Sequence, residues 1–193
     1  MSLNVSKNGI KVGQQTVEYT ENFKLLGVHF QHNLLWSNHI IEICKRANNR
    51  LVLLRRLKRA GFDINELLMY YKLCIRPVIE YACPVWHTML TKDQTHQLEI
   101  IQKRALLTIF SGDMVKVAAV TTDLSTLHDR CETLAKNFFN KLIASDDIFI
   151  QNCLPKTCYG DSRLRKHDIR LTCACRTSIY SRSLIPYGIR HWK

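Results

Sequence analysis

Between residues 37 and 145, apolar side chains recur at the three- and four-residue spacing of helices that are buried along one side. Such a stripe has to be covered, so helices that carry one pack against each other. This pattern predicts a bundle of four helices. The expected buried stripes are Ile40, Ile43, Cys44, Ala47, Leu51 and Leu54 in the first helix, Leu98, Ile101, Ala105 and Ile109 in the third, and Cys131, Leu134, Phe138 and Leu142 in the fourth.

Local signals mark where these helices begin and end. A Ser, Thr or Asp that accepts a hydrogen bond from a nearby backbone N–H favours a helix start, and Gly favours a helix end. Proline lacks a backbone N–H, so we expect the second helix to stop before Pro77 and a further break at Pro84. The expected boundaries are Ser37 and Gly61, Asp63–Glu66 and Arg76, Thr91–Gln94, and Thr126–Asp129.

The ends of the chain differ from this central region. Residues 3–30 contain an Asn8-Gly9 turn signal and further strand-like runs at 16–19 and 23–30. After Ser145 the periodicity weakens and the sequence is basic. We therefore expect a mainly α protein with three parts: a small N-terminal β-hairpin or sheet element (1–36), a helical bundle (37–145) and a basic, loop-rich C-terminal region (146–193).

The net charge of the chain indicates what kind of partner it binds. The chain has 28 Lys and Arg against 16 Asp and Glu, a formal net charge of +12, which favours a polyanion such as nucleic acid. The segment from Lys45 to Gly61 contains seven Lys or Arg and no acid. On a helical wheel Lys45, Arg56 and Arg59 lie opposite Ala47, so this face is expected to present only positive charge, without acids within four residues to pair with it.

Four readings of this basic helix are open: a solvated face, a membrane-surface helix, a helix that binds a partner protein, and a helix that contacts nucleic-acid backbone. The bundle should cover its leucines, which weakens the membrane and partner-protein readings. Backbone contact needs only well-placed Lys and Arg, and we favour it. Without an apolar run of membrane length or a secretion signal, we expect no membrane partner and an intracellular protein, nuclear or cytoplasmic and not secreted.

The eight cysteines are expected to be reduced thiols. Those at apolar helical positions should pack in the core: Cys44, Cys74, Cys83 and Cys131. Zinc is disfavoured because the spacings in the C-terminal region fit standard sites poorly; the residues concerned are Cys153, Cys158, Cys173 and Cys175, with His167 and His191 as further candidates. Three more histidines, His29, His32 and His39, lack the geometry of metal ligands and are expected to be at the surface or partly buried. We predict no metal site.

Asp146 and Asp147 are adjacent aspartates, the residue type with which polymerases hold two metal ions. They follow the fourth helix instead of lying in the turn of an apolar hairpin, and no third acid stands in a strand nearby. We interpret them as a loop at a helix end. The sequence therefore predicts no catalytic residue.

Several blocks, in this order, resemble one family over nearly the whole chain. They are FKLLGVHFQHNLLWSNHI, the basic helix, IRPVIEYACPVWH, QLEIIQKRALLTIF and RSLIPYGIRHWK. Together they resemble the C-terminal part of reverse transcriptases (RNA-directed DNA polymerases) from non-LTR retrotransposons of the LINE-type, jockey-like group.

The resemblance implies roles for particular residues. Leu26, Gly27 and Val28 would form the tip of a primer-grip-like element. The bundle would be a thumb that holds a template–primer or RNA–DNA duplex by its backbone, with little sequence preference. Its contacts would be Lys45, Arg46, Arg50, Arg55, Arg56, Lys58 and Arg59. Trp36 would stack on a nucleotide or anchor the thumb to the core, while Tyr81, Pro84 and Trp86 would pack.

The family's catalytic carboxylates and their Mg²⁺ belong to the palm, upstream of the primer grip. The resemblance therefore implies a C-terminal fragment that has no cofactor of its own and is inactive alone, with the palm and fingers of a full-length enzyme as a further partner. Two alternatives stay open: a non-functional structural relic, and a helical module that binds another protein.

Overall fold

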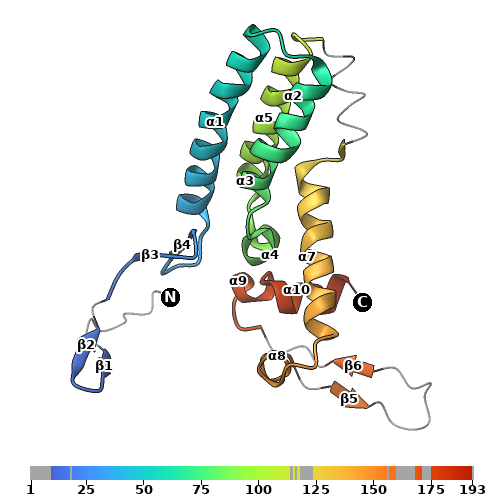
Figure 1. Ribbon diagram of the computed structural model, residues 1–193. Helices are drawn as coiled ribbons and strands as arrows, with labels where there is room; N and C mark the ends of the chain where they lie inside the picture. Colours follow the sequence, from blue (N-terminus) through green and yellow to red (C-terminus); the bar gives the residue numbers. More distant parts are fainter. Residues whose placement is uncertain are drawn as a thin grey trace.

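The computed structural model of the chain is mainly helical, as predicted (Figure 1). It describes residues 10–17, 19–113, 115, 117, 124–155, 157–159, 168–170 and 175–192. The strands are β1 (Ile10–Val12), β2 (Gln15–Val17), β3 (Asn22–Leu25), β4 (Val28–Gln31), β5 (Thr157–Tyr159) and β6 (Asp168–Arg170). The longer helices are α1 (Ser37–Arg59), α2 (Ile64–Tyr70), α5 (Lys92–Ile109), α7 (Leu127–Ile143) and α10 (Leu184–His191). The shorter ones are η1 (Tyr71–Ile75), α3 (Arg76–Glu80), α4 (Cys83–Trp86), η2 (His87–Met89), α8 (Ile148–Cys153) and α9 (Ser178–Ser181).

The β element consists of antiparallel hairpins. Strand β1 pairs with β2 and β3 with β4; the expected Asn8-Gly9 turn lies outside the described residues. The prediction of one continuous strand over residues 23–30 is wrong, because the chain reverses at Leu26 and Gly27. Both residues have positive φ angles, 46° and 83°, the backbone that a two-residue hairpin turn requires.

Helix α1 buries its predicted stripe. Ile40, Ile43, Ala47, Leu51 and Leu54 are buried and Cys44 is half-buried. Ser37 is the first helical residue, not the cap that was expected, and Trp36 before it makes no side-chain cap. Gly61 ends the helix as predicted. Its φ of 90° lets Phe62 donate to the Leu57 carbonyl at 3.3 Å, the hydrogen bond typical of a glycine-terminated helix.

The predicted stop before Pro77 is wrong. Helix α2 begins at the expected Asp63–Glu66 capping box, then passes through the π-helical turn η1 into α3, which carries Pro77 in its first turn. The wider π turn changes the hydrogen-bond spacing ahead of the proline, so the missing N–H no longer interrupts the helix. The break comes instead at Ala82, whose φ is 53°, and Pro84 lies in the first turn of α4.

Helices α5 and α7 begin at the predicted caps. In α5 the buried stripe is as expected. In α7 the stripe is shifted by one residue after Cys131, because Ala135 and Phe139 are buried while Phe138 is 43% exposed. Helix α10, far away in the sequence, packs on this face and sets which residues are covered.

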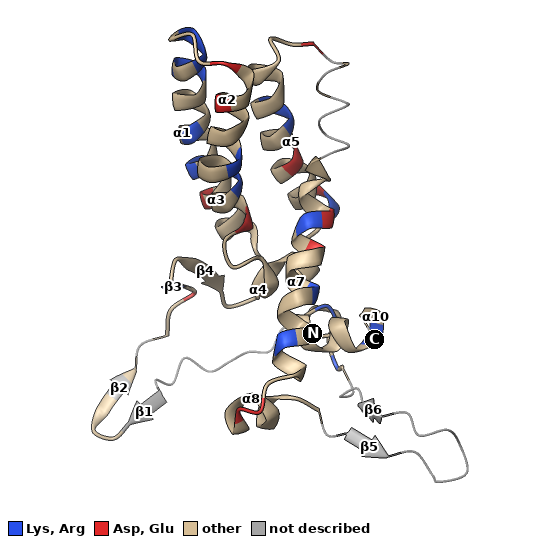
Figure 2. Ribbon diagram, turned by 45° about the vertical axis from the view of Figure 1, so that its right-hand side comes forward, with Lys and Arg blue, Asp and Glu red and all other residues tan. Residues whose placement is uncertain are grey.

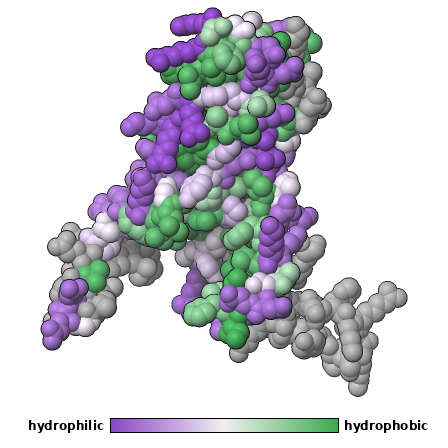
Figure 3. Space-filling view, in the orientation of Figure 1, coloured by the Kyte–Doolittle hydropathy of each residue, from purple (hydrophilic) through white to green (hydrophobic). Residues whose placement is uncertain are grey.

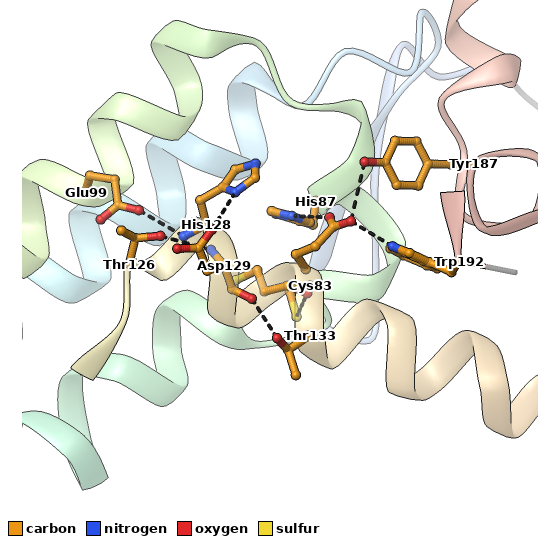
Figure 4. A network of polar contacts seen from close by, with 11 residues as sticks. Cys83, His87, Glu99, Thr126, His128, Asp129, Thr133, Tyr187 and Trp192 are labelled. Carbon is orange, nitrogen blue, oxygen red and sulfur yellow. Dashed lines mark hydrogen bonds and ion pairs between the residues drawn. The ribbon is translucent and has the colours of Figure 1, made fainter. Parts of the chain in front are cut away.

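Figure 4 shows His87, Tyr187 and Trp192 converging on one carboxylate. It belongs to Glu132 of α7, which lies 2.7 Å from Trp192 Nε1, 3.4 Å from the Tyr187 hydroxyl and 3.2 Å from His87 Nε2. Gly188 allows the close approach of α10, since a Cβ there would lie 2.6 Å from the Phe139 ring. This contact joins the end of the chain to the bundle.

Candidate nucleic-acid interface

Four of the seven basic residues predicted to contact nucleic acid form a free cationic face on α1. Lys45, Arg55, Arg56 and Arg59 are exposed, and none makes a hydrogen bond or ion pair within the described part of the chain. Lys and Arg recur along α1 in Figure 2, and hydrophilic residues gather on its outer side in Figure 3. At 1.5 Å per residue, the face extends about 21 Å from Lys45 to Arg59.

The other three residues are engaged within the protein. Arg46 pairs with Glu42 at 3.0 Å, which corrects the expectation that no nearby acid pairs with these charges. This hydrogen bond lowers the pKa of Glu42. The Arg50 guanidinium donates to the carbonyl of Cys74. Since a guanidinium has five N–H donors, both arginines keep donors for a further partner.

Lys58 is the residue whose role changes most. Its Nζ lies 2.6 Å from the carbonyl oxygen of Thr108 and 2.5 Å from that of Ile109, at the C-terminus of α5. A cation there satisfies end carbonyls and interacts favourably with the helix dipole. The helical spacing carried a signal for this position, because Lys58 comes four residues after Leu54 and so falls on the buried stripe.

The helical wheel predicted a face that presents only positive charge, and this prediction is wrong. Ile41, Val52 and Leu53 are 62%, 44% and 46% exposed on α1. Ile41 and Val52 share the helical stripe of Lys45 and Arg56. The face therefore combines separated cations with short apolar patches.

The primer-grip-like residues lie at the tip of the β3–β4 hairpin, near the start of α1. Leu26 is 83% exposed, whereas Val28 is buried. Tyr81, expected to pack, lies against this turn but is 52% exposed. Its hydroxyl donates to the Leu26 carbonyl at 2.7 Å, and a Cβ on Gly27 would lie 3.4 Å from its ring.

Aromatic packing joins this hairpin to the bundle. Trp36 is buried, and the centre of its ring lies 5.5 Å from that of Phe30 and 5.9 Å from that of His39. Of the two roles expected for Trp36, stacking on a nucleotide or packing as an anchor, the structure shows packing. Trp86 is also buried, as predicted, and Pro84 is half-buried.

His39 is fully buried, so the surface or partly buried position expected for it is wrong. The desolvation of its ring lowers its pKa to about 4, with further lowering by His29 and Arg46. His39 is therefore neutral at pH 7. His29 is half-buried and His32 exposed.

No group of three or more His, Cys, Asp or Glu that could hold a metal ion occurs among the residues that the structure describes. Asp147 caps α8, accepting from the Phe149 N–H at 2.8 Å, which confirms the helix-end interpretation of the aspartate pair. Cys83 and Cys131 are buried as predicted, and Cys44 and Cys74 are half-buried. The zinc candidates Cys173 and His167, and the side chain of Cys158, lie outside the described residues.

Within the described ranges, no helix is both long and apolar enough to cross a membrane. Comparison with family models, curated proteins and solved structures finds no match to this chain. The candidate site therefore rests on its own geometry: the cationic face of α1 and the exposed tip of the β3–β4 hairpin beside it.

Proposed function

We propose that this chain is a thumb-like module of a non-LTR retrotransposon reverse transcriptase, and that it binds template–primer nucleic acid through the phosphate backbone. Polymerisation would need the carboxylates and Mg²⁺ of a palm that this chain does not itself supply. The module would act inside the cell, in the nucleus or cytoplasm, where such a duplex is made.

The observation that carries the proposal is the free cationic face of α1. Four Lys and Arg point away from a helix whose opposite side is locked into the core, so a rigid scaffold fixes their spacing. Phosphate contact needs such positioned cations and carries little sequence information. The scattered apolar side chains on this face can contact sugars, and they are too few to bury a membrane-binding surface.

The test is binding of a blunt RNA–DNA duplex, measured by fluorescence anisotropy at several salt concentrations. We expect micromolar or tighter affinity and similar binding to duplexes of unrelated sequence. Changing Lys45, Arg56 and Arg59 together to Glu should abolish binding.

The matched control changes Lys92, Lys136 and Lys141 to Glu. These residues are also exposed, and the control alters the net charge equally while leaving α1 intact. Loss of binding in the α1 variant alone supports the proposal. Equal loss in both variants would assign binding to net charge, and unchanged binding in the α1 variant would contradict the proposed interface.

A protein-interaction module remains a second candidate, because the hairpin exposes apolar residues. Phe23, Leu25 and Leu26 of the β3–β4 hairpin are 49%, 55% and 83% exposed, and a two-stranded sheet has open edges. The palm and fingers of a polymerase would be one such partner. Pull-down of a protein partner that survives nuclease treatment would favour this function over nucleic-acid binding.

A further inference from the structure

A pocket of about 550 Å³ lies between the β3–β4 turn, α1 and α3. Leu26, Pro77, Val78 and Tyr81 form its apolar part, and Arg46 and Arg50 add guanidinium groups. Ligand pockets in proteins commonly have volumes of about 300–1,000 Å³ and combine apolar walls with a few polar groups. Two lining residues, Arg46 and Arg50, belong to the helix that carries the cationic face.

The aromatic wall of the pocket is held in place before any ligand binds. The hydrogen bond from the Tyr81 hydroxyl to the Leu26 carbonyl fixes the ring against the hairpin turn. The ring also lies against Gly27, since a Cβ built on this glycine would be 3.4 Å from it, an ordinary van der Waals distance. Half of the Tyr81 side chain nevertheless stays exposed, so its ring is available for stacking.

The two guanidinium groups each have a hydrogen-bond partner within the protein. Glu42 holds Arg46, and the Cys74 carbonyl holds Arg50. Each keeps N–H donors beyond these contacts, and guanidinium groups bind phosphate oxygens through paired hydrogen bonds. The carboxylate of Glu42 offsets one of the two positive charges, so the pocket suits one phosphate better than a highly charged group.

An aromatic ring beside apolar side chains and two guanidinium groups matches a nucleotide: the base stacks on the ring and the phosphate meets the cations. We propose that this pocket receives one unpaired nucleotide at the end of a strand whose duplex lies along α1. The proposal rests on the proposed function, because α1 must bring the duplex to the pocket.

The experiment compares an RNA–DNA duplex with a blunt end and the same duplex with a one-nucleotide overhang. We expect the overhang to bind about tenfold more tightly, as one stacked base would give. A third duplex carries an abasic overhang, with the extra phosphate but no base, and should gain much less. If the duplexes with the abasic and the complete overhang bind equally well, the gain in affinity comes from charge, and the proposal that the pocket binds a base is wrong.

Variants test the pocket itself. Tyr81→Leu should remove the overhang advantage and keep blunt-end binding, whereas Tyr81→Phe retains the ring and should keep most of the advantage. Val78→Trp, which fills the pocket from α3, should act like Tyr81→Leu. A persisting advantage in both Tyr81→Leu and Val78→Trp would overturn the proposal. If the wild-type protein binds all duplexes equally well, the proposed nucleotide pocket is wrong but duplex binding by α1 stands. If it binds none of them, the proposed function is wrong as well.

Discussion

The buried His39 predicts a specific loss of stability in mild acid. Its pKa is about 4 in the folded protein against 6.5 as the ordinary value, because burial disfavours the protonated ring. Between these values the unfolded chain binds the proton and the folded chain does not, so stability falls as the pH is lowered from 6.5 towards 4. At about 1.4 kcal/mol per pKa unit, lowering the pH from 7.5 to 5 should cost about 2 kcal/mol through this residue.

Thermal unfolding of the wild type and of His39→Gln at both pH values measures this contribution. For a chain of this size, about 2 kcal/mol corresponds to a fall in Tm of roughly 4–8 °C. Burial also lowers the pKa of His87, so both proteins should share a residual pH dependence, and only the difference between them reports on His39. The exposed His32→Gln serves as a control. If His39→Gln loses as much stability between the two pH values as the wild type, the reasoning is refuted.

Three further substitutions test contacts that position the helices, each by thermal or denaturant unfolding. Glu132→Ala removes the acceptor of Trp192 and should cost about 2–3 kcal/mol, while Glu132→Gln keeps an acceptor oxygen and should cost less; equal losses would show that the hydrogen bonds contribute little. Gly188→Ala should destabilise by about 1–3 kcal/mol because the Phe139 ring has to move, and unchanged stability would mean that α10 is not packed as described. Lys58→Met removes the hydrogen bonds to the carbonyls at the C-terminus of α5 and should lower the free energy of unfolding by about 1–2 kcal/mol. The salt dependence of duplex binding should stay the same, and a change in it would show that Lys58 contacts the duplex.

The starts of α2, α5 and α7 were predictable because their capping signals are local. A capping box needs only two residues three apart, and the pairs Asp63–Glu66 and Thr91–Gln94 form as expected. The stop expected at Pro77 failed because a π turn, which no short motif announces, accommodates the proline. The buried stripe of α7 shifted because α10 covers it, a contact that sequence spacing does not show.

The candidate site was also predictable only in part, because some of its contacts join residues that are far apart in the sequence. Exposure of Lys45, Arg56 and Arg59 followed from the helical wheel. The spacing also contained signals for Arg46 and Lys58. Glu42 stands four residues before Arg46, and Lys58 stands four residues after the buried Leu54. The prediction counted both residues as free cations and did not use these signals. The hydrogen bond of Arg50 had none, because its acceptor is a backbone carbonyl brought near only by folding.

The central claim is that the free cations of α1 bind phosphates, and the salt dependence of blunt-duplex binding tests it most directly. With four free cations in contact, a plot of log binding constant against log salt concentration should have a slope of about −3.6, a loss of roughly 100-fold between 50 and 200 mM salt. The triple variant of Lys45, Arg56 and Arg59 should bind too weakly to give such a slope. A slope near zero, or the same steep slope in that variant, would contradict the account.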